Sequence, residues 1–211
     1  MLVGIGALTI AAIAGGLYWQ KSTSGCTKIA HIGDSLTAYT TPALDAAYRE
    51  QGFEPTIDAH GARAILQKLS ADPKTGKQAA LDLRASGFDG CWVVALGTND
   101  TANVAVGSSY TRAKAIDEMM EAIDPEKKAK VLWVNTRTKM SSGAWHNDNM
   151  VKWNLELEQA KARWPNLQVF DWASYSVANP APYSDGIHHT PEGYAVRNHA
   201  IAAAAKRAFA G

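Results

Sequence analysis

The sequence predicts an α/β fold, a three-layer α/β/α sandwich in which helices cover both faces of a parallel sheet of about five strands. Short apolar runs alternate with helical segments along the 211 residues. These runs are nearly continuous, which is typical of strands buried on both faces. Polar residues follow the runs directly, at the strand ends where open α/β sheets bind ligands.

The first strand lies within residues 27–36, where Ile29, Ala30 and Ile32 supply apolar character and Gly33 permits a sharp turn. Further strands are expected at residues 53–58, 91–96, 131–135 and 167–170. Helices are expected at residues 41–51, 67–85 in two pieces, 110–123, 149–163 and 191–209, with a polar loop at 136–149. Proline and glycine at 72–76 break the second of these helices.

The bulk composition is that of one globular domain. A hydrophobic content of 46% and a formal net charge of +1 give no basic footprint, so nucleic acid is not an expected partner.

The N-terminus differs from the rest. Residues 2–19 are uncharged and end in Tyr18-Trp19, and such a run is about the minimum length that crosses a bilayer. A buried helix and a cleaved signal peptide are the alternatives. We expect residues 1–20 to be a transmembrane anchor or signal segment, 21–26 a short linker and 27–211 the folded domain. The protein would then be exported, either membrane-anchored facing outside the cytoplasm or secreted.

The two cysteines precede two strands by similar distances. Cys26 lies seven residues before Gly33, and Cys91 lies six before Gly97. If both glycines lie at one end of the sheet, the cysteines lie level at the other end, and a disulfide suits an oxidising compartment. Two ordinary buried thiols are the alternative.

Three strand-end segments hold polar groups that nucleophilic catalysis needs. Ser35 is the candidate nucleophile, because it follows the first strand in Gly33-Asp34-Ser35-Leu36. Asn99 follows the third strand and offers an amide donor, and Gly61 follows the second strand and offers a backbone N–H. With the N–H of Ser35, these donors could form an oxyanion hole.

The base and its orienting acid are expected in Asp185-Gly186-Ile187-His188. A spacing of three in a turn can set the Asp185 carboxylate against the His188 imidazole. Thr190-Pro191 then starts the last helix, as a cap followed by proline. His189 lacks an acid three residues upstream and is not the expected base.

These four segments, Gly33-Asp34-Ser35-Leu36, Gly61, Gly97-Thr98-Asn99-Asp100 and Asp185-Gly186-Ile187-His188, resemble the ordered motif blocks of the SGNH (GDSL) hydrolases. The resemblance implies a flavodoxin-like sandwich, Ser35 as nucleophile, His188 as base, Asp185 as its orienter, and an oxyanion hole from Ser35, Gly61 and Asn99. The sequence of residues 90–100 is also similar to that of SGNH domains attached to actinobacterial cell-envelope acyltransferases.

Further polar residues near these segments are candidates for lining the pocket: Asp34, Thr98, His60 and His146. His31 and His199 are expected to be structural. The sequence contains no metal-ligand spacing, no phosphate-binding glycine motif and no Gly-x-Ser-x-Gly elbow, so no metal or cofactor is expected.

The sequence therefore predicts an exported serine esterase, and the resemblance implies that its substrates are small acyl esters, acetyl foremost, of a cell-envelope glycan or glycolipid. An acyltransferase with the same triad is the first alternative, because a sugar hydroxyl can replace water. A non-catalytic envelope-binding protein is the second, although a binding module has no need of a triad.

Overall fold

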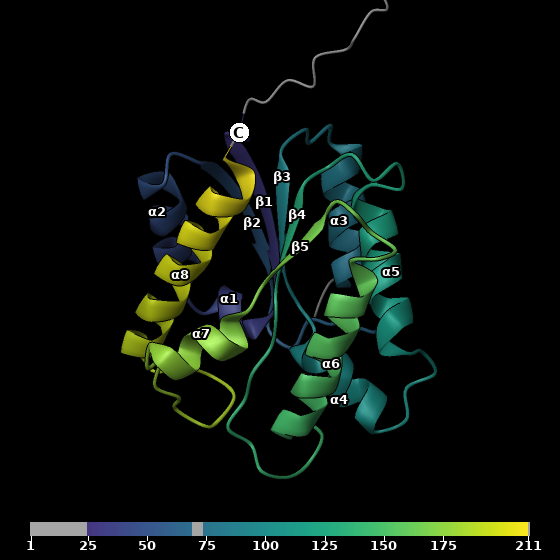
Figure 1. Ribbon diagram of the computed structural model, residues 1–211, viewed down its shortest axis with the longest axis vertical. Coiled ribbons are helices and arrows are strands. Elements are labelled where there is room, and N and C mark those ends of the chain that lie inside the picture. The colour runs from purple at the N-terminus through teal and green to yellow at the C-terminus, as the bar shows by residue number, and fades with distance from the viewer. Residues whose placement is uncertain (1–24, 69–73, 211) are drawn as a thin grey trace, which may run out of the picture.

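The computed structural model describes residues 25–68 and 74–210 and shows one five-stranded parallel sheet in the order β2-β1-β3-β4-β5. Figure 1 shows the sheet between two layers of helices. The strands are β1 (Lys28–Gly33), β2 (Glu54–Ala59), β3 (Cys91–Ala95), β4 (Val131–Val134) and β5 (Leu167–Phe170). The predicted α/β sandwich is confirmed, and this strand order is the flavodoxin-like one, with its switch point between β1 and β3.

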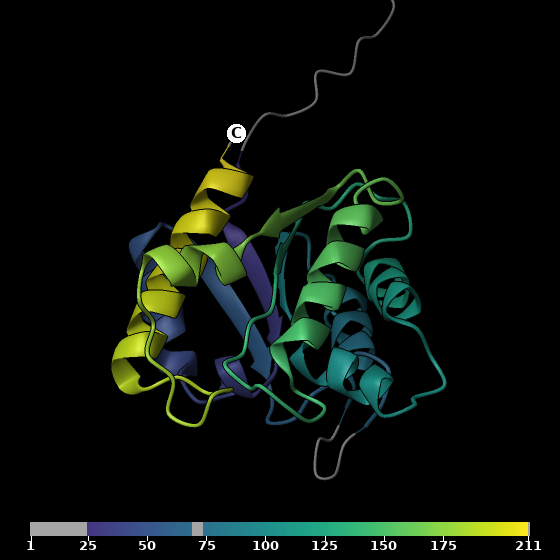
Figure 2. The same cartoon turned by 60° about the horizontal axis from the view of Figure 1, so that its bottom comes forward.

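Eight helices are described over these ranges: α1 (Ser35–Ala38), α2 (Thr41–Glu50), α3 (Gly76–Ala85), α4 (Thr98–Ala105), α5 (Arg112–Ile123), α6 (Asn147–Ala160), α7 (Trp172–Ala178) and α8 (Pro191–Phe209). Helices α3, α5 and α6 cover one face of the sheet, and α2, α7 and α8 cover the other (Figures 1 and 2). Two apolar cores therefore form, one on each side of the sheet.

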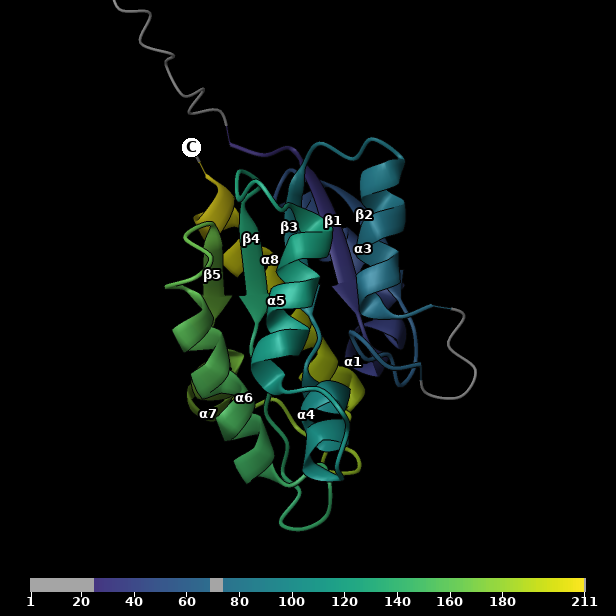
Figure 3. The ribbon, with the colours of Figure 1, turned by 90° about the vertical axis from the view of Figure 1, so that its right-hand side faces the viewer.

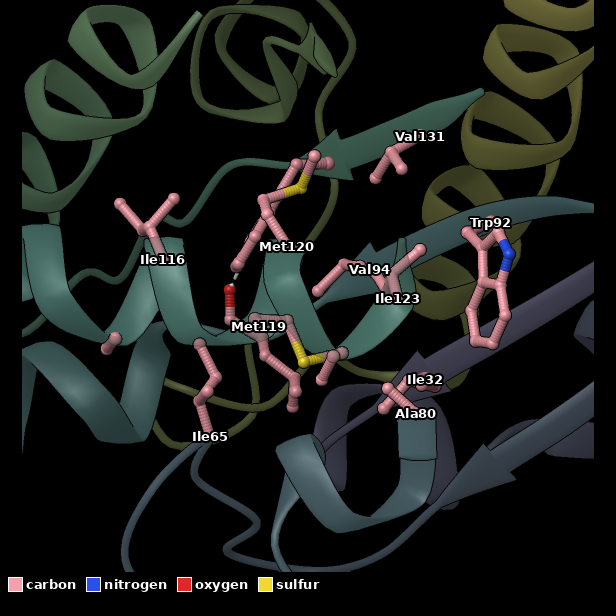
Figure 4. Close-up of a cluster of buried hydrophobic side chains, with 14 of the residues drawn as sticks. Ile32, Ile65, Ala80, Trp92, Val94, Ile116, Met119, Met120, Ile123 and Val131 are labelled. Carbon is pink, nitrogen blue, oxygen red and sulfur yellow. Dashed lines mark hydrogen bonds between the residues drawn. The ribbon is translucent and has the colours of Figure 1, made fainter. Parts of the chain in front are cut away.

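Successive strand residues serve opposite cores, because side chains alternate across a strand. On β1, Ile29 packs toward α2 and α8, whereas Ala30 and Ile32 pack toward the other layer. Figure 4 shows the core on the side of the sheet that α3, α5 and α6 cover, where Met119 and Met120 of α5 lie against the sheet. Burial on both faces explains why β3 and β4 are apolar throughout and why β1 is apolar except for Lys28 and His31.

All five strands point toward the end of the sheet where α1 and α4 begin, as Figure 3 shows for β1, β4 and β5. At the opposite end, Cys26 and Cys91 form a disulfide with a Cα–Cα distance of 5.9 Å. Cys91 pairs in register with Ile29 of β1, so the bond joins two neighbouring strands. The predicted pairing is confirmed, and it lies far from the strand ends that carry Ser35.

One expected helix is shorter than its pattern suggests. Of the two pieces expected over residues 67–85, α3 begins only after Thr75, whose side chain accepts the Gln78 N–H as an N-cap. Residues 67 and 68 are not helical, and 69–73 lie outside the described residues. The chain at 64–65 instead accepts hydrogen bonds from Gly76 and Lys77, which folds this segment against the start of α3.

Three helices were not expected. Helix α1 and helix α4 begin directly after strand-end turns, and α7 is capped by Asp171, which accepts the Ser174 N–H. Their sequences are short and rich in small polar residues, which read as turn chemistry. The remaining expected helix and strand boundaries agree with the structure within about three residues.

The expected anchor at residues 1–20 and most of the linker, through residue 24, lie outside the described residues. Among the helices of residues 25–68 and 74–210, none has both the length and the apolar character needed to span a membrane.

Candidate active site

Ser35 lies on a tight turn between β1 and α1. Asp34 forms the N-cap of α1, and its Oδ1 accepts the Leu36 N–H at 2.9 Å. This capping bond fixes the turn that presents Ser35, whose side chain lies at a helix N-terminus with 8% of the residue exposed. A small part of the serine therefore reaches solvent while its backbone is held in the interior.

Ser35 contacts His188, which comes from the loop between α7 and α8 together with Asp185. His188 Nε2 lies 2.9 Å from Ser35 Oγ, and His188 Nδ1 lies 2.7 Å from Asp185 Oδ2. The three predicted residues are therefore connected in one hydrogen-bonded series, although Ser35 and His188 are 153 positions apart in the chain.

The Asp185–His188 turn holds its own geometry. Gly186 adopts a φ of +88°, a backbone conformation that favours glycine. Asp185 Oδ1 accepts the N–H groups of Ile187 and His188 at 2.8 and 2.6 Å. Burial alone would raise the pKa of Asp185, but hydrogen bonds from the side chain and backbone of His188 outweigh it and lower this pKa to about 2. Asp185 is therefore ionised at neutral pH and can support an imidazolium.

Gly61 and Asn99 follow the two strands that flank β1. Gly33 pairs with Ala59 of β2 and with Ala95 of β3, so the loops after all three strands begin at one level. A Cβ at Gly61 would meet no atom within 4 Å, so the space on that side of the Cα is open. This topology brings the three predicted oxyanion donors to one end of the sheet.

Asn99 is held by two contacts that fix the orientation of its amide. Asn99 Nδ2 donates to the Arg63 carbonyl at 3.1 Å, and Asn99 Oδ1 accepts from Trp145 Nε1 at 3.4 Å. A carbonyl can only accept and an indole N–H can only donate, so the two neighbours determine which side of the amide is nitrogen. The second hydrogen of Nδ2 remains for a further acceptor.

The loop that carries Gly61 is tied to the same helix. Asp100 Oδ1 accepts the Ile65 N–H at 2.8 Å, next to the bond from Asn99 to Arg63. Within this loop, Ala62 adopts a φ of +57°, the left-handed region that non-glycine residues rarely occupy. Such strain collects at functional sites and persists because surrounding contacts impose it.

A serine, a histidine and a carboxylate in this order can perform nucleophilic acyl chemistry. A sequence profile of the GDSL-like Lipase/Acylhydrolase family matches residues 31–196, a range that contains all five proposed catalytic and oxyanion residues. The chain belongs to this family. As a GDSL-like enzyme, it is a carboxylic ester hydrolase by family, in a class that contains esterases and acyltransferases.

Solved structures support the same fold for this GDSL-like protein. The C-terminal catalytic domain of Streptococcus pneumoniae peptidoglycan O-acetyltransferase A has a TM-score of 0.63 at 16% identity, and the match covers 86% of this chain and 92% of that one. A carbohydrate acetylesterase family member from Sinorhizobium meliloti has a TM-score of 0.68 at 14% identity, covering 87% and 99%. The aryl esterase of M. smegmatis gives 0.62 at 17% identity, covering 86% and 99%. No curated protein matches the chain by sequence.

Buried polar groups support helix α1 from below. His31 contacts Tyr48 OH through Nδ1 at 2.8 Å and Thr37 Oγ1 through Nε2 at 3.1 Å, and Arg197 Nη1 donates to the Leu36 carbonyl at 3.1 Å. Burial and the Arg197 charge lower the pKa of His31 to about 3, so His31 is neutral. The expected structural role of His31 is confirmed by these contacts.

The candidate pocket residues Asp34, Thr98, His60 and His146 differ in their burial and local contacts. Asp34 and Thr98 are buried, and the Asp34 carboxylate caps α1 instead of facing an open surface. His146 accepts the Asp148 N–H as the N-cap of α6, and His60 contacts the Gly61 carbonyl. The structure thus gives Asp34 and His146 capping contacts, which reflects how often polar residues at element ends satisfy backbone groups.

Two aromatic residues at the site were missed in the sequence. Tyr39 lies 5.3 Å from His188 between ring centroids, and Trp145 contacts Asn99. The available signal was Trp145 in an otherwise polar loop, because a large aromatic side chain there has no core to join.

Proposed function

We propose that this GDSL-like enzyme is a serine esterase that hydrolyses small acyl esters, foremost acetyl esters, through an acyl-enzyme on Ser35. The observation that carries the proposal is the hydrogen-bonded series from Ser35 through His188 to Asp185, with distances of 2.9 and 2.7 Å. His188 can accept the proton of Ser35. Because Asp185 is ionised, its carboxylate then stabilises the imidazolium that forms.

The reaction proceeds in two halves. Ser35 Oγ attacks the carbonyl carbon as His188 Nε2 takes its proton, and the N–H groups of Ser35 and Gly61 and the Asn99 amide stabilise the oxyanion. The bond to the alcohol then breaks, and His188 gives its proton to the leaving oxygen. Water that loses a proton to His188 next attacks the acyl-enzyme. The bond from the acyl carbon to Ser35 Oγ then breaks, His188 returns its proton to Oγ, and the carboxylic acid is released.

We place the ester on a cell-envelope glycan or glycolipid. The resemblance of residues 90–100 to envelope acyltransferase domains supports this, as do the names of two proteins of similar fold, a peptidoglycan O-acetyltransferase and a carbohydrate acetylesterase family member. The disulfide suits export to an oxidising compartment.

If residues 2–19 stay in the membrane, residues 20–26 span at most about 25 Å, which keeps the domain near the bilayer. Finding the full-length protein in a soluble fraction would contradict that anchor.

An active-serine phosphonate and a chromogenic ester series test the proposal. We expect the probe to label Ser35, the Ser35→Ala variant to escape labelling and to lose hydrolysis, and activity to fall as the acyl chain grows beyond acetyl. A folded wild-type protein that neither reacts with the probe nor cleaves any ester is a binding protein instead. Faster acyl transfer to an added sugar than to water would identify an acyltransferase.

A further inference from the structure

Two of the aromatic residues in the described part of the chain are exposed, and both contact the site. Tyr39 is 64% exposed and Trp145 38%, whereas every other aromatic residue of residues 25–68 and 74–210 is buried or half-buried. Tyr39 lies against His188, and Trp145 lies against Asn99. The two therefore flank the reacting centre on its base side and on its oxyanion side.

A groove of about 510 Å³ begins at Tyr39 on the base side. Its volume lies within the range of small-molecule sites, roughly 300–1,000 Å³. It runs between the start of α2 and the first turns of α8, and it is lined mainly by Tyr39, Thr40, Pro42, Pro191, Tyr194 and Asn198. Because Tyr39 lines the groove and its ring also lies against His188, the groove begins beside the proposed base.

The chemistry of ester cleavage determines which half of the substrate lies there. His188 Nε2 must reach the leaving oxygen to protonate it, so the alcohol half lies on the His188 side. The carbonyl oxygen lies toward Gly61 and Asn99, on the other side of Ser35. Resting on the esterase function proposed above, we infer that the Tyr39 groove binds the alcohol half of the ester and that Tyr39 determines specificity for it.

The lining indicates an uncharged alcohol with one flat apolar face. None of the lining side chains is charged at neutral pH, since burial lowers the pKa of His189, at the groove floor, to about 4. Proline, alanine and tyrosine side chains supply most of the surface, while the ring of Tyr39 keeps one side in water. A pyranose ring fits this surface, because its C–H face can pack on an aromatic ring while its hydroxyls stay hydrated. A fully apolar alkyl chain in this groove would leave much of its surface exposed to water, because the ring of Tyr39 is itself exposed.

The same groove serves the reverse step. A sugar hydroxyl that attacks the acyl-enzyme must lose its proton to His188 from the position that the leaving oxygen occupied. Occupancy of the groove by a sugar therefore also favours acyl transfer over hydrolysis.

The test compares two acetate esters that differ only in their alcohol. Methyl acetate is too small to reach the groove, whereas an O-acetylated methyl hexopyranoside extends into it. For Tyr39→Ala, we expect the ratio of kcat/KM for the acetylated pyranoside to that for methyl acetate to fall about tenfold, the scale of one aromatic contact. Tyr39→Phe should keep the wild-type ratio, and Ala195→Trp, which fills the groove from α8, should lower it. Val106→Ala, an exposed apolar residue of another surface, is the matched control.

The rate at which water releases acetate from the acetyl-enzyme separates recognition from positioning. The alcohol has left at that stage, so Tyr39→Ala should change this rate far less than it changes the ratio. Equal losses for both esters and for deacylation would mean that Tyr39 only positions His188, which overturns the inference, as would an unchanged ratio in Tyr39→Ala and Ala195→Trp. Cyclohexyl acetate preferred over the pyranoside would overturn the sugar assignment. A wild-type protein that forms no acetyl-enzyme would contradict the esterase function itself, and this distinguishes the two failures.

Discussion

Ser35 and the Asp185–His188 turn meet at one hydrogen bond, but they come from regions that are held in different ways. Ser35 is 8% exposed, at the end of a central strand above buried His31, Asp34 and Arg197. The side chains of Asp185 and His188 are 53% and 26% exposed, on a surface loop. The proposed nucleophile is held by the core, and the proposed base is held by hydrogen bonds within its own turn.

This difference predicts how substitutions divide between activity and stability. A change on the exposed side removes chemistry and little packing, because the side chains of Asp185 and His188 are partly exposed on a surface loop. A change on the buried side disturbs groups that the fold must keep paired or neutral away from water, so it changes stability and its dependence on pH.

The largest effect is expected from the two adjacent histidines, which lie on opposite sides of this division. His188→Ala should lower kcat by roughly 10⁴-fold or more, since triad members act as a unit, with little loss of stability. His189 is buried, donates from Nδ1 to the Pro182 carbonyl, and packs against Trp172, Tyr183 and Tyr194. His189→Ala should keep most activity but lower the free energy of unfolding by about 2–4 kcal/mol.

Hydrolysis of a chromogenic acetate and urea unfolding with the disulfide intact measure the two quantities. A well-folded His189→Ala protein without activity, beside an active His188→Ala protein, would show that the base has been assigned to the wrong residue.

Asn99→Ala should give the next largest loss. Asn99 is buried at the switch point, and one N–H of its amide is bound to the Arg63 carbonyl. In the proposed mechanism, the other N–H donates to the oxyanion. We expect kcat to fall by roughly 10²–10³-fold with little change in KM, as for a donor used mainly in the transition state. Steady-state kinetics at a temperature where both proteins are folded decide this. A change mainly in KM would place Asn99 in substrate binding.

Asp34 tests the buried side through pH. Burial raises the pKa of Asp34 from 3.8 to about 6, and the Arg197 charge opposes this only in part. The folded state thus binds this proton more tightly than the unfolded state, and the resulting stabilisation, complete below the unfolded pKa, is lost as pH rises through about 6. This difference in pKa corresponds to about 3 kcal/mol.

Asp34→Asn keeps an oxygen for the Leu36 N–H and removes the titration. The free energy of unfolding of the wild type, minus that of the variant, should therefore fall by about 2.4 kcal/mol between pH 4 and 7, since part of the stabilisation is already lost at pH 4. Urea unfolding across this range measures it. Asp89 provides the control, because it is exposed and its hydrogen bond with Lys28 lowers its pKa. For Asp89→Asn, the free energy of unfolding of the wild type minus that of the variant should change little with pH above pH 4. Parallel pH curves for wild type and Asp34→Asn would show that Asp34 is ionised throughout.

The features that the sequence predicted correctly are those with a local physical cause, in which a residue type at one position determines the structure there. Apolar runs on buried strands, Thr190-Pro191 at the start of α8 and the cysteine spacing each have a local physical cause, and the structure has the corresponding features. The Asp185–His188 turn is equally local, since its geometry comes from bonds between residues three apart.

Contacts between distant segments could not be read in this way. Asn99 to Arg63, Trp145 to Asn99 and Tyr39 to His188 each join residues that only the folded sheet brings together. Helices α4 and α7 were missed for a related reason, because tertiary packing stabilises short helices whose own sequences favour turns. The catalytic residues could therefore be predicted from local sequence patterns. The contacts that orient them, and the residues that would determine specificity, depend on the fold.

The smallest expected effect tests one of these distant contacts. Trp145→Phe keeps the ring but removes the indole N–H that donates to Asn99 Oδ1. One neutral hydrogen bond is worth about 0.5–1.5 kcal/mol, so kcat should fall roughly two- to tenfold, with KM nearly unchanged. Because this bond acts only by orienting the Asn99 amide, Trp145→Phe should have no further effect once Asn99 is alanine. A double-mutant cycle with Asn99→Ala measures this coupling. Additive losses would mean that Trp145 contacts the substrate directly, and that the Asn99 amide is held by the Arg63 carbonyl alone.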